Sequence, residues 1–189
     1  MAGLIKGIDI SKYQSAKFNT SGLDFVFIKA TEGTHWTNSL MHSQASGARA
    51  AKLVLGYYHF LRPGDIAAQA QHFVSTSAAL SGDLLAGDWE DPGVSCAQKD
   101  QFLREVKKLR PHNRVLLYCN VDYWRHRDTT SYAADGLWIA DYGASPGHPR
   151  ITSSWKFHQY SDRPVDSDLA QFSSRAALQT WAGQSGTKG

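Results

Sequence analysis

The most informative chemical feature of the sequence is a pair of acids, Asp88 and Glu90, separated by a single residue. They lie where an apolar run over residues 84–89 ends. Alternate residues of a strand share a face, so the two carboxyl groups point the same way, with backbones about 7 Å apart. One protonated and one ionised carboxyl group are the usual equipment for splitting a glycosidic bond. The alternative interpretation is a pair of solvated loop acids beside Asp91.

Further acids fall where other apolar runs end. Asp9 closes the first run, Asp141 closes the sixth, and Asp166 and Asp168 lie in the last and weakest one. Functional groups of parallel barrels gather at the C-terminal ends of the strands. If these runs are strands of one barrel, the acids crowd at one rim, and crowding raises the pKa of at least one carboxyl group.

Aromatic residues are expected near the same rim, where their rings suit the apolar faces of sugars. They are Tyr57, Tyr58, Trp89, Tyr118, Trp138 and Tyr142. Tyr57 and Trp138 are better explained as core residues. Tyr58, Tyr118 and Tyr142 fit either the core or a sugar-binding surface.

Motifs for metal, nucleotide or serine-nucleophile chemistry are missing from the sequence. The eight histidines are scattered, without H-E-x-x-H, and neither G-x-G-x-x-G nor a Walker motif occurs. No G-x-S-x-G is present, and Cys119 lies inside an apolar run, too buried for a nucleophile. His59, at a strand end, either orients an acid, contacts substrate, or is structural, as a lone histidine more often is.

Eight short runs rich in apolar, β-branched and aromatic residues are typical of buried strands. They cover residues 4–10, 25–30, 53–60, 84–89, 115–119, 137–141, 155–160 and 165–169. Amphipathic segments predict helices over residues 39–51, 65–80, 95–109 and 173–181.

Strands that alternate with helices imply an α/β protein with a mainly parallel sheet. About eight strands with fewer helices favour a modified TIM-like barrel that has lost some outer helices, since residues 141–155 leave little room for one. An open doubly wound sheet is the alternative. We expect a single catalytic barrel domain over residues 1–181 and a small polar tail, or the start of a linker, over 182–189.

The composition excludes several classes of protein. Of the 189 residues 42% are hydrophobic, and six Trp, eight Tyr and eight Phe supply a core, which excludes general disorder. No apolar run approaches the roughly 20 residues that span a bilayer. The net charge of +3 is spread along the chain rather than gathered in a nucleic-acid-binding face. Residues 1–7 lack a signal-peptide pattern, and Cys96 and Cys119 are expected to be free thiols.

Seven short motifs occur in order along the chain. They are G-I-D-I-S at 7–11, K-A-T-E-G at 29–33, G-Y-Y-H-F at 56–60, D-W-E at 88–90, Y-C-N at 118–120, L-W-I-A at 137–140 and H-Q-Y-S at 158–161. K-A-T-E-G is the most specific of them. Together they resemble the glycoside hydrolase family 25 muramidases, also called Chalaropsis-type lysozymes, over residues 4–180.

The resemblance implies a role for each acid of the first strands. Glu90 would be the general acid, and Asp88 would assist it by positioning or stabilising charge on the substrate's 2-acetamido group. Asp9 would bind or polarise the cleaved sugar. Trp89 and nearby aromatic residues would desolvate Glu90 and so raise its pKa.

The last acid of the family is ambiguous in this sequence. The family motif V-D-x-N-x-F is replaced by V-D-S-D-L-A-Q-F over residues 165–172. Counting from the valine selects Asp166, counting back from the phenylalanine selects Asp168, and Asp166 is slightly favoured. The substrate-binding residues expected besides the acids are Lys29, Glu32, Tyr58, His59, Tyr118, Trp138, Asp141 and Tyr142.

The resemblance also implies the fold, a barrel of eight strands with about five helices, and the reaction that the protein catalyses. The reaction is hydrolysis of the β-1,4 bond from N-acetylmuramic acid to N-acetylglucosamine in bacterial peptidoglycan, with retention through the acetamido group. We expect a monomer that needs no cofactor or metal, binds no nucleic acid and does not insert into membranes. The expected setting is a bacteriophage endolysin released from the host cytoplasm to the cell wall, or otherwise a secreted enzyme. A non-catalytic cell-wall-binding module and a metal-dependent polysaccharide deacetylase are the rival interpretations.

Overall fold

A closed barrel of eight strands is the centre of the computed structural model, which describes residues 3–183. In their order around the barrel, the strands are β1 (Ile5–Ile10), β9 (Ser167–Ala170), β8 (Phe157–Ser161), β7 (Gly136–Ala140), β6 (Arg114–Asn120), β5 (Leu84–Asp88), β4 (Val54–Phe60) and β2 (Phe25–Glu32). Pairing of β1 with β2 closes the ring. A short extra strand, β3 (Trp36–Thr37), pairs with the end of β2. The predicted α/β barrel is thus confirmed.

One strand runs against the others. The barrel pairs are parallel except those of β9, which is antiparallel to both β1 and β8. The connection from β8 to β9 has only five residues, whereas a parallel crossover needs a dozen or more, so the chain must turn back here. The sequence pattern predicted this strand but not its direction.

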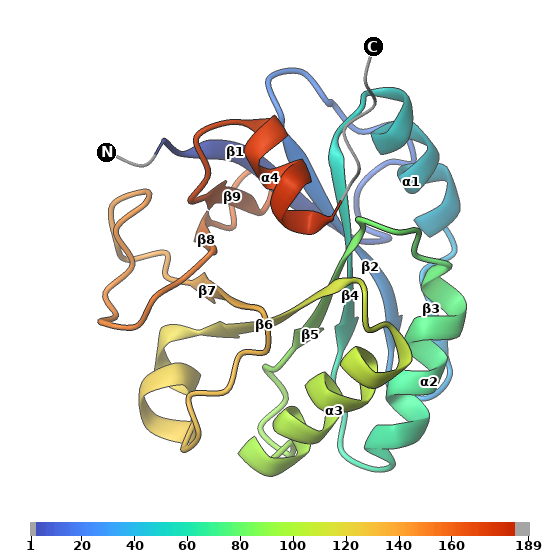
Figure 1. Cartoon of the computed structure of the whole chain (residues 1–189), viewed down its shortest axis with the longest axis vertical. Coiled ribbons are helices and arrows are strands. Elements are labelled where there is room, and N and C mark those ends of the chain that lie inside the picture. Colours follow the sequence, from blue (N-terminus) through green and yellow to red (C-terminus); the bar gives the residue numbers. More distant parts are fainter. Residues whose placement is uncertain (1–2, 184–189) are drawn as a thin grey trace.

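Helices cover only part of the barrel. They are α1 (Met41–Ala50), α2 (Ile66–Ser77), α3 (Cys96–Leu109), the π-helical turn η1 (Tyr123–Arg127) and α4 (Arg175–Ala182). Figure 1 shows α1, α2 and α3 beside β2, β4 and β5, while loops flank β7 and β8. Asp65, whose residue type suits helix capping, caps α2, and Ser95 forms a capping box with Gln98 at the start of α3. The turn η1 was not predicted.

Side chains alternate between the inside and the outside of the barrel. On β2, Phe25 and Phe27 belong to the inner cluster of buried residues, whereas Val26 and Ile28 pack outward with α1, α2 and α3. Phe27 stacks on Trp138 of β7 at 4.2 Å between ring centroids. Because β2 and β7 are not neighbours in the sheet, these two rings meet across the barrel interior.

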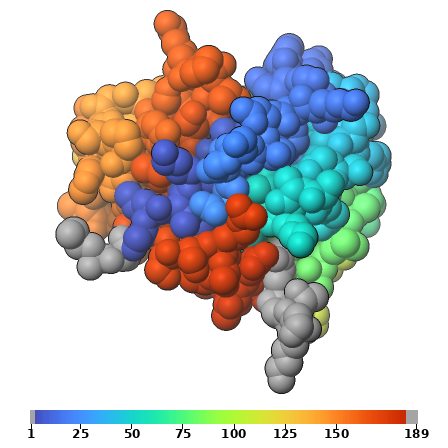
Figure 2. Space-filling model, turned by 90° about the horizontal axis from the view of Figure 1, so that it is seen from above, coloured from blue at the N-terminus to red at the C-terminus, as the bar shows by residue number. Residues whose placement is uncertain are grey.

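Two further features seal the inner cluster. A Cβ added at Gly56 would lie 2.3 Å from the ring of Phe27, so β4 needs a glycine at this close approach. Leu178 and Ala182 of α4 join the inner cluster and cover one end of the barrel. In Figure 2 the blue N-terminal segment lies beside the red α4 segment, in keeping with the pairing of β1 and β9.

The described residues form one barrel, and α4 ends one residue beyond the predicted domain boundary. The rest of the predicted polar tail, residues 184–189, lies outside the described residues. None of the helices in residues 3–183 has the length and apolar character needed to cross a bilayer.

Candidate active site

A pocket of about 250 Å³ opens at the C-terminal ends of the parallel strands. All eight barrel strands, or the residues directly beside them, contribute to its wall. The lining residues are Asp9, Ser11, Tyr13, Lys29, Tyr58, Phe60, Asp88, Glu90, Tyr118, Trp138, Tyr142, Gln159 and Asp166. Asp166 reaches this rim because β9 runs in the opposite direction, so its start lies where the other strands end.

Strand alternation decides which residues reach the pocket. Asp88 and Glu90 both line it, as their spacing predicts, and Trp89 between them turns outward. Trp89 is fully buried, donates its indole N–H to the carbonyl oxygen of Val94 at 2.9 Å and packs edge-on against Tyr123. Trp89, expected with nearby aromatic residues to desolvate Glu90, therefore does not line the pocket, since its ring lies on the opposite face.

Asp88 and Glu90 have unequal surroundings. Asp88 is only 5% exposed, and its Oδ1 has no hydrogen-bond partner among the described residues. Burial and the neighbouring charge of Glu90 both raise the pKa of Asp88 well above its ordinary value. Burial also raises the pKa of Glu90, while the nearby hydroxyl of Tyr118 lowers it and the charge of Asp166 raises it further. The site thus favours protonated carboxyl groups.

A second group of acids, on or beside strands β1 and β9, lies on the side of the pocket opposite Asp88 and Glu90. Asp166 lines the pocket, and its carbonyl oxygen accepts a hydrogen bond from the backbone N–H of Asp9 at 3.1 Å. Asp168 lies beneath, fully buried, where Trp138 donates its indole N–H to Oδ1 at 2.7 Å. Burial raises the pKa of Asp168 to about 7. Burial and the charges of Asp168 and Asp166 raise the pKa of Asp9 well above its ordinary value.

Gln159, which was not among the predicted site residues, connects the two sides of the pocket. Its side-chain N–H donates to the carboxylate of Asp9, and its carbonyl oxygen accepts hydrogen bonds from the hydroxyls of Tyr118 and Tyr142, each at 2.6 Å. Inward alternation on β8 was the signal that could have identified it. Ser11, Tyr13 and Phe60 also line the pocket without having been predicted as site residues.

His59 is placed elsewhere, and its predicted contact with substrate is corrected. It follows the inward-facing Tyr58 on β4 and therefore points outward, fully buried and stacked on Phe102 of α3. Its ring nitrogens contact Thr31 Oγ1 at 2.7 Å and Gln69 Oε1 at 3.1 Å. Burial lowers the pKa of His59 to about 4, so this neutral ring is part of the core between β4 and the helices.

Asp141 also lies outside the pocket. It comes one residue after the inward-facing Ala140 and accepts hydrogen bonds from the backbone N–H and the guanidinium of Arg150. Those bonds hold the pKa of Asp141 below its usual range. Asp141 therefore anchors the loop before β8 instead of contacting the pocket.

Lys29 and Glu32 occupy different positions. Lys29 lines the pocket, and its Nζ forms an ion pair with Glu32 Oε2 at 2.6 Å. Glu32 lines an adjoining hollow of about 260 Å³ instead. Trp138, expected both as a core residue and as a substrate contact, is 1% exposed and contributes to the pocket floor.

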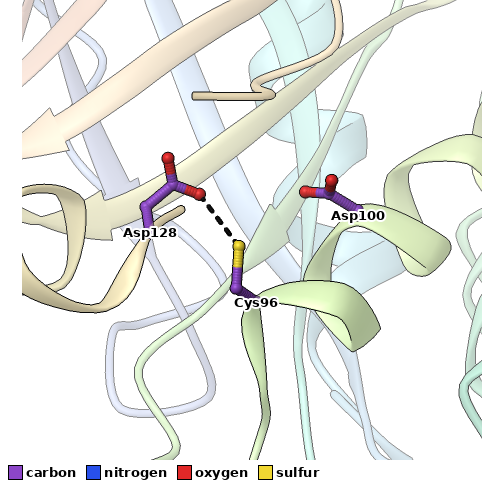
Figure 3. Close-up of side chains that lie close together, drawn as sticks. All are labelled: Cys96, Asp100 and Asp128. Atoms are coloured by element: carbon purple, nitrogen blue, oxygen red, sulfur yellow. Dashed lines mark hydrogen bonds between the residues drawn. The ribbon is translucent and has the colours of Figure 1, made fainter. Parts of the chain in front are cut away.

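A separate cluster on α3 and the loop after η1 has the ligand types of a metal site. Figure 3 shows Cys96, Asp100 and Asp128 close together, with the Cys96 thiol donating to Asp128. The ammonium of Lys99, fully buried, forms ion pairs with Asp128 at 2.8 Å and with Asp100. This cation already neutralises the acids, so the cluster is explained by Lys99. Cys96 and Cys119 are both free, as expected.

Comparisons with known proteins agree with this architecture. The family model described as glycosyl hydrolases family 25 matches residues 8–169. The N,O-diacetylmuramidase of a Chalaropsis species is 44% identical over 181 residues, covering 81% of this chain and 84% of that protein. The autolytic lysozyme of Clostridium acetobutylicum is 36% identical over 168 residues, covering 84% of this chain but 51% of that protein. The chain thus spans about half the length of this bacterial relative.

Solved structures show the same barrel. A family GH25 lysozyme from Aspergillus fumigatus superposes with a TM-score of 0.83 at 27% identity, covering 96% of this chain and all of that one. A muramidase from Acremonium alcalophilum gives a TM-score of 0.80 at 29% identity, with the same coverage. With the family model covering most of the barrel, the chain belongs to glycosyl hydrolases family 25.

Proposed function

We propose that the protein is an N-acetylmuramidase that hydrolyses the β-1,4 bond from N-acetylmuramic acid to N-acetylglucosamine in peptidoglycan. The observation that carries this proposal is the placement of Asp88 and Glu90 side by side in the pocket of a family 25 barrel. Relatives named as a lysozyme and an N,O-diacetylmuramidase support it.

Glu90 acts as the general acid in this proposal. Its raised pKa keeps it protonated to higher pH than a solvated glutamic acid, so it donates its proton to the glycosidic oxygen as the bond from C1 breaks. The carbonyl oxygen of the substrate's acetamido group attacks C1, and Asp88 stabilises the positive charge that develops on that group. A water activated by Glu90 then opens the cyclic intermediate, which gives retention of configuration.

The remaining pocket residues bind and orient the sugars. Asp9, held by Gln159, binds the sugar whose bond is cleaved, and Asp166 completes the acidic wall. Asp168 does not line the pocket, so we assign it a positioning role through Asp9. The aromatic surfaces suited to the apolar faces of sugar rings are those of Tyr58, Tyr118, Trp138 and Tyr142.

Digestion of purified peptidoglycan followed by mass spectrometry of the soluble fragments tests the proposal. Fragments that end in reducing N-acetylmuramic acid are expected, and Glu90→Gln should abolish their release while the variant remains folded by circular dichroism. Glu105→Gln, the same change on α3, is the matched control and should keep full activity.

Other outcomes would change the proposal. Fragments ending in reducing N-acetylglucosamine, or free stem peptides, would keep the wall substrate but move the cleaved bond. Binding to the wall without release of fragments would favour the non-catalytic cell-wall-binding module. Near-normal cleavage by folded Glu90→Gln would remove Glu90 from the mechanism.

The setting and assembly state stay predictions. We propose a monomeric enzyme that acts at the cell wall, made as a bacteriophage endolysin, without affinity for nucleic acid or insertion into membranes. Light scattering of the purified protein tests the monomer, and a native precursor carrying a secretion signal would replace the phage setting with a secreted enzyme.

A further inference from the structure

The hollow beside the catalytic pocket continues the same surface. Both share Ser11, Tyr13 and Lys29 in their walls, so a ligand can extend from one into the other. The full wall of the hollow is Ser11, Lys12, Tyr13, Lys29, Glu32, Trp36 and Arg62. None of the acids of the catalytic pocket lines it.

The charges in this hollow are unbalanced. Three cations face one carboxylate, that of Glu32, which forms ion pairs with Lys29 at 2.6 Å and with Arg62 at 2.6 Å. Arg62 is also paired with Asp91 at 2.8 Å, outside the hollow. Lys29 and Arg62 are therefore already engaged by the protein's own acids.

Lys12 is the cation that has no acidic partner. Within residues 3–183 its ammonium makes neither an ion pair nor a hydrogen bond, and it lies over two aromatic rings, 5.3 Å from the centroid of Tyr13 and 5.4 Å from that of Trp36. The rings hold the ammonium at the hollow, so a ligand meets a positioned cation beside an apolar surface. A carboxylate there gains a charge-assisted hydrogen bond without displacing an internal ion pair.

We propose that this hollow, through Lys12 and Trp36, binds a carboxylate of the stem peptide carried by the muramic acid in the catalytic pocket. The inference rests on the proposed muramidase function. In a peptidoglycan strand the sugars are neutral, and the free carboxylates belong to the peptides attached through the lactyl ether of muramic acid. A neutral sugar would use the rings alone, whereas the unpaired ammonium selects the anionic peptide.

The test compares two soluble substrates, glycan chains with their stem peptides and the same chains stripped of peptides by an amidase. The lactyl carboxylates that the amidase exposes are then converted to methyl amides, so that the stripped chains carry no carboxylate. The readout is the ratio of kcat/KM for the peptide-bearing chains to kcat/KM for the stripped chains. We expect Lys12→Gln to lower this ratio about threefold to fivefold, chiefly through KM, because the ion pair between Lys12 and the peptide carboxylate would be partly exposed to solvent. Lys17→Gln removes the same charge from the same loop but lies outside the hollow, so it should keep the wild-type ratio.

Capping the peptide carboxylates by amidation identifies the recognised group. Amidated chains should lower the wild-type kcat/KM to the level of Lys12→Gln and leave that variant unaffected. An unchanged ratio in Lys12→Gln, or equal losses in Lys12→Gln and Lys17→Gln, would overturn the peptide site while the muramidase function stands. Failure of the wild type to cleave either substrate would instead overturn the proposed function.

Discussion

The side-chain amide of Gln159 donates a hydrogen bond to the carboxylate of Asp9, a residue 150 positions earlier in the chain. The hydroxyls of Tyr118 and Tyr142 both donate to the carbonyl oxygen of the same amide, each at 2.6 Å. These two donors fix the orientation of the amide, so its N–H group must face Asp9. The hydrogen bond lowers the pKa of Asp9 against the effects of burial and of the neighbouring acids.

Replacing Gln159 with Glu should therefore impair catalysis more than substrate binding. The change removes the donor to Asp9 and adds a carboxyl group to a pocket that already holds four. We expect kcat to fall about 100-fold through misplacement of Asp9 and the tyrosines. Gln171→Glu, an exposed position just after β9, is the matched control. Steady-state kinetics within twofold of wild type for a folded Gln159→Glu would contradict the positioning role.

Asp168 should make the stability of the protein depend on pH. Its pKa is about 7 in the folded protein and about 3.9 in an unfolded chain. Between these values the folded state binds a proton that the unfolded state has released. The contribution of Asp168 to stability is therefore greatest below about pH 4 and is lost as pH rises toward 7. Each such group contributes a slope of at most about 1.4 kcal/mol per pH unit.

The variant Asp168→Asn should flatten this pH dependence. Urea unfolding at pH values from 4 to 8 should give a smaller fall in the free energy of unfolding than in the wild type. Asp122→Asn, at an exposed acid whose side chain is 75% accessible, should leave the slope unchanged. Parallel slopes in all three proteins would show that Asp168 titrates as an ordinary acid.

Most of the barrel could be predicted from the sequence because buried strands leave a strong local pattern. All eight barrel strands coincide with predicted apolar runs, and α2 and α3 begin directly after Asp65 and Ser95, the first residues of the predicted helical segments. The direction of β9 could not be read from its own residues, since it depends on the short connection that precedes it. The turn η1 lacks the length that makes helical periodicity visible.

The site was predictable where spacing and alternation agreed. Asp88 and Glu90 face the pocket because they lie two residues apart where β5 ends, and the backbone N–H of Trp89 still bonds to Tyr118 of the next strand. The predictions for His59 and Asp141 were wrong because proximity to a strand end does not determine which face a side chain takes. Their preceding neighbours, Tyr58 and Ala140, face inward, so alternation turns both residues outward. Inward alternation on β8 could have placed Gln159 in the pocket, but its role follows from contacts with residues far away in the chain.

The neighbours Tyr58 and His59 provide a direct test of this alternation. Tyr58→Phe removes a hydroxyl from the pocket and should lower kcat/KM roughly tenfold, with the free energy of unfolding nearly unchanged. His59→Leu leaves the buried hydroxyl of Thr31 without its partner and removes one of the two donors to Gln69 Oε1, so it should lower the free energy of unfolding by about 2 kcal/mol. Its kcat/KM below the melting temperature should stay within about twofold of wild type. The reverse pattern would place His59 at the substrate.

Lys99 should contribute strongly to stability although it lies away from the pocket. Lys99→Met keeps much of the side-chain volume but leaves the carboxylate of Asp128, 2% exposed, without its cation. Breaking such a buried pair costs about 3–5 kcal/mol. Lys108→Met makes the same change at an exposed position of α3 and should cost much less. A loss equal to that of the control in chemical denaturation would contradict the assignment.

Adding Asp128→Asn to Lys99→Met should recover part of the lost stability, because it removes the uncompensated charge. The Lys99 ammonium also lies 5.6 Å from the ring centroid of Trp89, the residue between Asp88 and Glu90. Loss of Lys99 should therefore weaken the packing of Trp89 and so make the positions of Asp88 and Glu90 on either side of it less fixed. We expect kcat of Lys99→Met to fall severalfold at temperatures where it remains folded. The double variant should recover stability without fully recovering kcat, since Trp89 still lacks the Lys99 ammonium.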